Sequence, residues 1–204
     1  MAIEFSPTNI FRFASFSAPF MLCFFLVMSS IFNQNLKGFV YLAGVMIASM
    51  INMLLMFIIG DKQTDEEALQ LCNIFDTPYS SGSYKSPSMS AMFIAFTFAY
   101  LYLPMRYNNQ HNYIVLVTLV ALFVIDVLNK VDNKCTTHSG SLLGGMVGFM
   151  LGIFWYVLFH MSGYDSLLYF DDYVSNKTVC NRPRKQTFKC SVYKNGELIQ
   201  KNIV

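Results

Sequence analysis

The residues of this sequence that could carry chemistry lie close together, at the end of an apolar run and in the polar segment after it. Asp126 lies about one turn before the end of that run, and Lys130, Asp132, Lys134 and His138 follow it. A carboxylate within a membrane helix costs about 2.5–3.5 kcal/mol at the helix centre and less near its ends. We expect these five side chains to gather at one membrane end of a helix bundle.

Asp126 can be interpreted in two ways. In the first, its carboxylate pairs with Lys130, which lies four residues later on the same helix face. In the second, Asp126 belongs to a proton or cation site, and such a site would need a second acid at matching depth in another helix. No other apolar run contains an acid, so the sequence favours the ion pair.

The cysteines and histidines do not form a recognisable metal or cofactor site. There is no Cys-x-x-Cys pair, and the three histidines are scattered. Cys23 lies in an apolar run, Cys72 and Cys135 lie in two loops expected on one side, and Cys180 and Cys190 lie near the C-terminus. A disulfide between Cys180 and Cys190 is possible. It would require an oxidising compartment, because thiols in the cytosol are kept reduced.

Composition predicts a membrane protein. The chain is 54% hydrophobic and 13% charged, with a mean hydropathy of +0.43, which is too apolar for a soluble domain of this length. A membrane-spanning helix needs about 20 apolar residues, and we expect about five of them in an all-α bundle over residues 1–163. The expected spans are Phe13–Phe32, Gly38–Gly60, Met89–Met105, Tyr113–Leu128 and Ser141–Gly163. The net charge of +2 is too small to favour nucleic acid as a partner.

Small residues recur at every fourth position in two of these segments. They are Gly144, Gly148 and Gly152 in one, and Ala91, Ala95 and Ala99 in the other. Small residues at this spacing clear one helix face, so that a second helix can approach closely within a membrane. We therefore predict that both stripes pack against other helices, with the glycine-rich helix at the centre of the bundle.

Residues 164–204 change in character and are expected to form a small extramembrane tail. Asn195 and Gly196 separate two strand-like runs, which is the pattern of a tight β-hairpin. A basic cluster precedes the hairpin and consists of Arg182, Arg184, Lys185 and Lys189. The tail is too short to bury a core of its own, so we expect these residues to dock on a partner.

The distribution of Lys and Arg predicts the orientation of the chain. With five helices, the tail shares a side with Lys37 and Arg106. Together these residues outnumber the Lys and Arg on the other side, which favours a cytosolic tail. If the tail were luminal, Asn176-Lys177-Thr178 would be an acceptor for glycosylation.

The order of loops and helices over residues 61–152 resembles the core of the type-2 phosphatidic acid phosphatases. Their motifs are Lys-x6-Arg-Pro, Pro-Ser-Gly-His and Ser-Arg-x5-His-x3-Asp. Here the second motif stands as Pro87-Ser88-Met89-Ser90, and the third keeps His138, the nucleophile by position. The arginine position of the third motif holds Asp132, its aspartate position holds Leu142, and the first motif is absent.

These departures argue against catalysis. Phosphoryl transfer through a histidine needs cations around the phosphate, an acid to orient the imidazole and a proton donor for the leaving group. His138 lacks all three at the expected positions. The resemblance therefore implies a phosphatase-like fold with degenerate motifs.

A second resemblance concerns the tail. The sequence CNRPRKQTFKCSVYKNGELI, with LLYF shortly before it, is similar to the end of a small polytopic membrane protein of large icosahedral DNA viruses. That resemblance implies a place in the inner membrane of the virion, with an exposed end that contacts the capsid shell. We expect a non-enzymatic structural or assembly protein without cofactors. The alternatives are the phosphatase-like protein and an accessory subunit of a cellular membrane complex.

Overall fold

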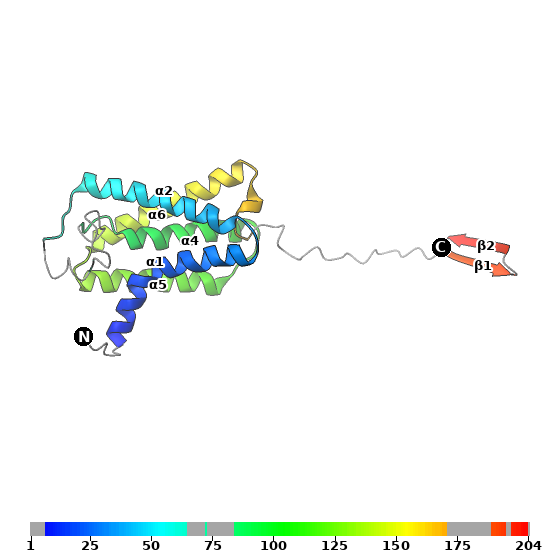
Figure 1. Cartoon of the computed structure of the whole chain (residues 1–204), viewed down its shortest axis with the longest axis horizontal. Coiled ribbons are helices and arrows are strands. Elements are labelled where there is room, and N and C mark those ends of the chain that lie inside the picture. The colour runs from blue at the N-terminus through cyan, green and yellow to red at the C-terminus, as the bar shows by residue number, and fades with distance from the viewer. Residues whose placement is uncertain (1–6, 65–71, 73–83, 171–188, 195–196, 204) are drawn as a thin grey trace. The chain divides into compact units, whose positions relative to one another are not determined.

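The structure, a computed structural model, describes residues 7–64, 72, 84–170, 189–194 and 197–203 (Figure 1). The chain divides into two compact units, Met1–Asp172 and Tyr173–Val204. The first unit therefore extends past Gly163, the boundary expected from the sequence. It does so because the segment after the last helix packs back onto the bundle.

The first unit is a bundle of long helices. These are α1 (Pro7–Phe32), α2 (Lys37–Ile59), α4 (Met89–Tyr107), α5 (Tyr113–Asp132) and α6 (His138–Met161), followed by the short 3-10 helix η2 (Asp165–Leu167). Local sequence sets several of the helix ends. Asn112 and Thr137 cap α5 and α6 by accepting the backbone N–H groups of Val115 and Gly140, at 3.3 and 3.0 Å. Gly60 ends α2 in the left-handed conformation, with φ of 67°.

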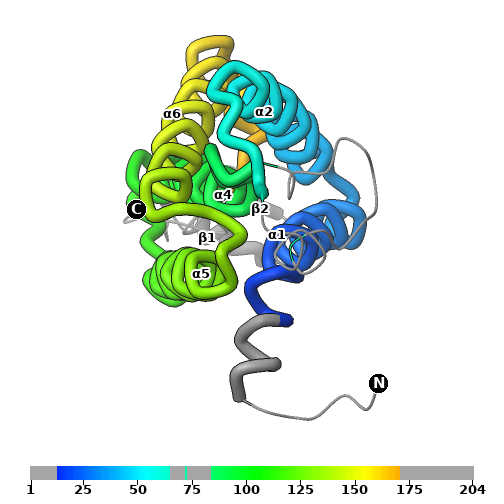
Figure 2. The backbone as a smooth tube through the Cα atoms, turned by 90° about the vertical axis from the view of Figure 1, so that its left-hand side faces the viewer, coloured from blue at the N-terminus to red at the C-terminus, as the bar shows by residue number. Residues whose placement is uncertain are grey.

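Four of the described helices, α1, α2, α5 and α6, are long and apolar enough to cross a membrane. The exception is α4, which carries polar groups such as Ser90, Thr97 and Arg106. Figure 2, which looks along the bundle, shows α4 enclosed by the other four helices. The expectation that the glycine-rich helix α6 lies at the centre is therefore wrong, because the enclosed helix is α4.

The glycines of α6 instead allow it to lie against the backbone of α4. A Cβ at Gly144 or Gly148 would collide with the backbone of Ser88 or Met92, and one at Gly152 would lie 2.6 Å from the Phe96 carbonyl oxygen. The contacts advance by four residues on both helices, so α4 and α6 run parallel. The two backbones can approach this closely only because these positions lack side chains.

The alanines of α4 do not act as a single stripe. Ala91 and Ala99 are fully buried, and the Ala99 methyl group lies 2.9 Å from where a Cβ at Gly152 would be. Ala95 is half-buried and lines an apolar groove between α4, α5 and α6. Only part of the predicted alanine face therefore contacts α6.

The remaining helices pack around α4 through a mixture of ring and polar contacts. Tyr41 of α2 hydrogen-bonds Thr97 of α4 at 2.7 Å. Trp155 of α6 lies against Gly44 of α2, where its indole N–H donates to the Val40 carbonyl at 3.2 Å. These contacts fix α2 against both α4 and α6.

The segment after α6 closes one end of the bundle. The Tyr169 hydroxyl donates to the Leu26 carbonyl of α1 at 2.7 Å, and the Asn108 side chain donates to the Phe170 carbonyl at 2.5 Å. Leu168, the residue before Tyr169, is buried. Burial, with a smaller contribution from Cys23, raises the pKa of Tyr169 to about 12.

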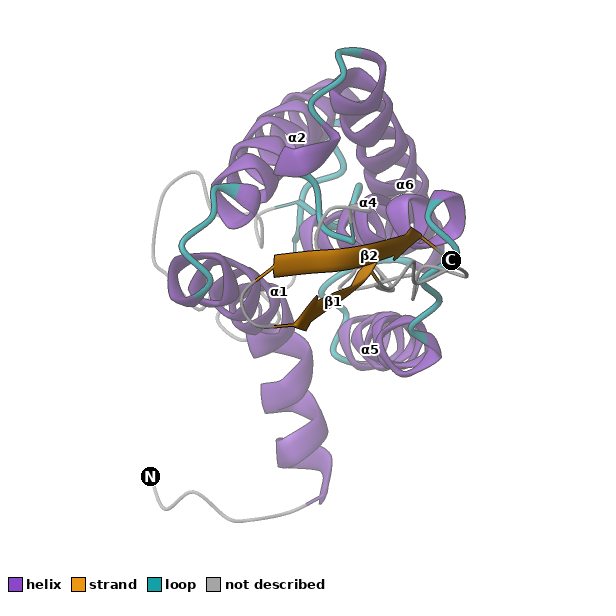
Figure 3. Cartoon of the chain, turned by 90° about the vertical axis from the view of Figure 1, so that its right-hand side faces the viewer, coloured by secondary structure: helices purple, strands orange, loops and turns teal. Residues whose placement is uncertain are grey.

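The second unit contains two strands, β1 (Lys189–Lys194) and β2 (Glu197–Ile203), coloured orange in Figure 3. They pair antiparallel, from Lys189 opposite Ile203 to Lys194 opposite Glu197, with an irregularity between Val192 and Tyr193. The predicted turn residues Asn195 and Gly196 and the basic residues Arg182, Arg184 and Lys185 lie outside the described residues. The hairpin as a docking element therefore stays a prediction.

The α4–α6 contact can be tested with Gly148→Leu. The added side chain meets the Met92 backbone, which cannot move aside as a flexible side chain could. We expect the free energy of unfolding to fall by at least about 1–3 kcal/mol. Each kcal/mol lost should lower the melting temperature by about 2–4 °C. The measurement is thermal melting of the purified protein in detergent. The control is Met150→Leu, at a position on α6 that is 65% exposed, and it should melt like wild type. If Gly148→Leu and Met150→Leu melted at the same temperature, the close contact between α4 and α6 would be contradicted.

Candidate functional site

A buried carboxylate joins three helices near one end of the bundle. The side chain of Asp126 in α5 is only 1% exposed. Its Oδ1 accepts a hydrogen bond from Ser15 of α1 at 2.9 Å, and its Oδ2 accepts one from Ser90 of α4 at 2.6 Å. Each carboxylate oxygen is therefore tied to a different neighbouring helix.

Lys130 completes this cluster. Its ammonium nitrogen lies 3.2 Å from Asp126 Oδ1, also donates to the Ser90 hydroxyl, and lies 5.4 Å from the centre of the Phe16 ring. The predicted ion pair between Asp126 and Lys130 is confirmed. We call Ser15, Ser90, Asp126 and Lys130 the polar cluster.

The polar cluster is suited to holding helices together. Ser15, Ser90 and Lys130 all present donors to one carboxylate, so a single side chain of α5 is bonded to both α1 and α4. Within the described residues, no group of three or more His, Cys, Asp or Glu side chains could hold a metal ion. A hydrogen-bonded ion pair of this kind satisfies polar groups that would otherwise face an apolar environment.

The other residues expected at this site lie at the same end of the bundle but outside the polar cluster. Asp132, Lys134 and His138 are exposed, and His138 is the first residue of α6. Of the five residues expected at this end, Asp126 and Lys130 belong to the polar cluster, whereas these three are exposed. Because residues two positions apart on a helix do not face each other, Asp132 lies away from the face shared by Asp126 and Lys130.

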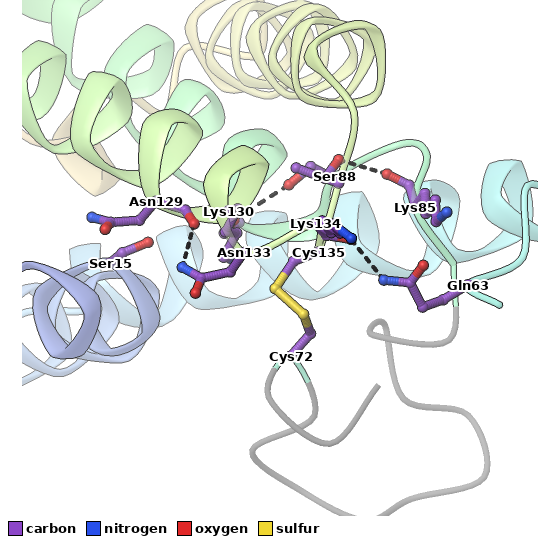
Figure 4. Close-up of a disulfide and its surroundings, with 12 residues drawn as sticks. Ser15, Gln63, Cys72, Lys85, Ser88, Asn129, Lys130, Asn133, Lys134 and Cys135 are labelled. Carbon is purple, nitrogen blue, oxygen red and sulfur yellow. Dashed lines mark hydrogen bonds between the residues drawn. A yellow bond between two sulfur atoms is a disulfide. The ribbon is translucent and has the colours of Figure 1, made fainter. Parts of the chain in front are cut away.

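A disulfide joins two loops at the same end of the bundle. Cys72 lies between α2 and α4, and it bonds Cys135, which lies between α5 and α6. Figure 4 shows the disulfide beside Lys130 and Asn133. Both cysteines were expected on one side of the membrane, but their pairing was not predicted from the sequence. The proposed pair Cys180 and Cys190 lies outside the described side chains.

Hydrogen bonds reinforce this end of the bundle around the disulfide. Gln63 donates its side-chain amide to the Lys134 carbonyl at 2.6 Å, and the Thr136 hydroxyl donates to the Lys85 carbonyl at 2.5 Å. The Ser88 N–H donates to the Gly140 carbonyl at 2.9 Å. The segment before α4 is thereby fixed to the loop before α6.

These bonds bring together the two segments that resemble phosphatase motifs. Ser88 belongs to the Pro-Ser segment, and Gly140 follows His138 by two residues. Ser90, at the position of the family's proton-donating histidine, donates to Asp126. Asp132 and Leu142, at the arginine and aspartate positions, are exposed. The segments are thus adjacent, while the residues that would hold a phosphate differ in chemistry.

An apolar groove of about 310 Å³ lies between α4, α5 and α6. It is lined by Ala95 and Phe98 of α4, Phe123 of α5, and Met146 and Phe149 of α6, among others. Because every lining residue is apolar, the groove supplies no group for acid–base or nucleophilic chemistry. Its lining matches the hydrocarbon of lipid chains.

A second polar pair lies at the other end of α6. His160 Nδ1 lies 2.7 Å from Asp165 Oδ1, with both side chains partly exposed. The imidazole stacks on the Tyr156 ring, at 5.5 Å between ring centres and 11° between planes, and Tyr107 also contacts both rings. Aromatic residues at this position are typical of a membrane–water interface.

Comparison of the chain with protein-family models, with curated proteins and with solved structures finds no match in any of the three. The polar cluster and the disulfide therefore have to be interpreted from their own chemistry.

The polar cluster can be tested by a double-mutant cycle. Asp126→Leu alone leaves the Lys130 ammonium without its carboxylate, and removing one partner of a buried pair costs about 3–5 kcal/mol. The double variant Asp126→Leu with Lys130→Met leaves no unpaired charge. We expect it to melt clearly above Asp126→Leu in detergent. If the double variant melted below the single one, the ion pair would not be the unit that holds α5 in place.

Proposed function

We propose that this chain is a non-enzymatic, multi-pass membrane protein with a structural or assembly role. The observation that supports this most directly is the use of the polar cluster. The buried carboxylate, its lysine and both serines are engaged with one another across α1, α4 and α5. A catalytic carboxylate would instead need one face open to a substrate.

We further infer that α4 crosses the membrane as a fifth helix, although it is less apolar than the other four. It runs parallel to α6 and contacts it along three successive turns. Polar groups on α4 such as Ser90 and Thr97 have partners within the bundle. Such groups are compatible with a membrane when other helices, rather than lipid, surround them.

The proposed location is the inner membrane of a large DNA virus, with the tail contacting the capsid shell. Its support is the resemblance in the wording of the tail sequence, together with the chemistry of that segment. Arg182, Arg184, Lys185 and Lys189 form a basic cluster, and β1 and β2 form a two-stranded sheet. A two-stranded sheet is only marginally stable by itself, and the edges of its strands can pair with another chain.

Docking of the tail can be separated from attraction to anionic lipid by Gly196→Val. Lipid attraction needs only charge, at about 1 kcal/mol for each cation near the surface. Docking also needs the hairpin turn, in which a β-branched residue is disfavoured where positive φ is expected. We expect Gly196→Val to insert into membranes normally but to be lost from assembled particles. Particle incorporation is measured by copurification.

The control is a variant with all four cations of the basic cluster neutralised. Normal incorporation of Gly196→Val together with loss of the neutralised variant would leave lipid attraction as the explanation. Copurification of the wild-type chain with a cellular membrane complex instead of particles would favour an accessory subunit.

The alternative is a phosphatase-like protein with degenerate motifs. One observation favours it, namely the hydrogen bond between Ser88 and Gly140 that joins the Pro-Ser segment to the start of the histidine-bearing helix. His138 is exposed at this junction. Asp132, at the family's arginine position, carries a negative charge and would repel a phosphate rather than bind it.

Phosphatase activity is tested directly with the purified protein. We expect no release of phosphate from phosphatidic acid or from a diphosphate lipid, and we expect His138→Ala to leave biological function intact. Turnover by the wild-type protein that disappears in His138→Ala would overturn the non-enzymatic proposal.

A further inference from the structure

The Cys72–Cys135 disulfide marks one end of the bundle chemically. Cys72 lies in the segment between α2 and α4, and Cys135 lies three residues before α6 begins. A disulfide between two loops persists only where the compartment is oxidising, because cytosolic reductants keep thiols reduced. The end of the bundle that carries this bond is therefore the end suited to an oxidising compartment.

The helix α6 separates that end from the start of the tail. It has 24 residues, which at about 1.5 Å per residue gives a length of about 36 Å. The hydrocarbon core of a bilayer is about 30 Å thick, and α6 is one of the four helices apolar enough to cross it. Cys135 and Gly163, at the two ends of α6, thus belong to opposite sides of a membrane.

The charge distribution agrees with this separation without depending on the disulfide. The disulfide end itself carries Lys and Arg residues, namely Arg12, Lys62, Lys85, Lys130 and Lys134. The other end carries Lys37 and Arg106, followed by the basic residues of the tail. Positively charged residues collect on the cytosolic side of membrane proteins, and the Lys and Arg residues of the tail make the total count favour a cytosolic tail.

We infer that the disulfide end of this protein faces an oxidising compartment and that its C-terminal tail emerges on the reducing, cytosolic side. On the oxidising side, the thiols of Cys72 and Cys135 exchange with a disulfide-bonded carrier. Their two sulfurs bond, and the carrier takes up the two electrons and two protons as a pair of thiols. The partner that binds the tail is then a protein of the cytosolic face, and Cys180 and Cys190 are free thiols. The orientation itself does not rest on the proposed function.

Glycosylation of the full chain in endoplasmic-reticulum microsomes tests the orientation. Tyr79→Asn creates an Asn-Ser-Ser acceptor with Ser80 and Ser81 in the segment between α2 and α4 that contains Cys72. We expect this variant to gain one glycan, seen as a mobility shift that an endoglycosidase removes. Tyr79→Gln is the matched control and should show no shift. The natural acceptor at Asn176 should remain unmodified, with Thr178→Ala as its control; a glycan lost in Thr178→Ala would overturn the orientation.

Thiol labelling decides the case in which neither acceptor is modified. In sealed microsomes a membrane-impermeant maleimide reaches only the cytosolic face. We expect Cys180 and Cys190 to react without reductant, and Cys72, freed by Cys135→Ser, to react only after the membrane is permeabilised. Labelling of Cys72 in sealed vesicles, or protection of the tail thiols until permeabilisation, would overturn the inference. If the orientation were confirmed but Gly196→Val were still incorporated normally into particles, only the proposed docking role of the tail would be removed.

Discussion

The contact between the backbones of α4 and α6 is the constraint on which the rest of the bundle depends. Lipid chains are as apolar as leucine, so helices in a membrane gain little from excluding water and must gain from close packing. Gly144, Gly148 and Gly152 let α6 approach α4 to backbone distance. With α4 fixed in this way, α1, α2 and α5 can surround it. Polar groups on α4 then face protein instead of hydrocarbon.

This enclosure explains the position of the polar cluster. A carboxylate facing lipid would be expensive, but Asp126 faces Ser90 on the enclosed helix and Ser15 on α1. Lys130 lies one turn closer to the helix end, and its ammonium group reaches back to Asp126 and Ser90. The cluster thus orients α5 about its axis and fixes α1 at the same time. Apolar packing alone would specify the rotation of α5 and the position of α1 less sharply, because the lipid-facing and protein-facing sides of these helices are both apolar.

The two ends of the bundle are held in different ways. At one end, the Cys72–Cys135 disulfide and the hydrogen bond from Gln63 to Lys134 tie two loops together. At the other, Tyr169 and Phe170 fold back onto α1 and onto the loop after α4. The covalent tie suits an oxidising compartment, whereas the non-covalent one is independent of redox conditions. This difference is what one would expect of a protein whose two ends lie on opposite sides of a membrane.

The sequence by itself determined the apolar helices, the glycine spacing and the pairing of Asp126 with Lys130. Each of these depends on residues a few positions apart, and helical periodicity alone relates such residues. Only the tertiary structure decided that α4 and not α6 is enclosed, that Ser15 and Ser90 bind Asp126, that Cys72 pairs with Cys135, and that His138 is exposed. These facts depend on which faces of distant helices meet. In a membrane the apolar pattern carries little of that information, because a helix side that faces lipid and one that faces another helix have the same hydrophobicity.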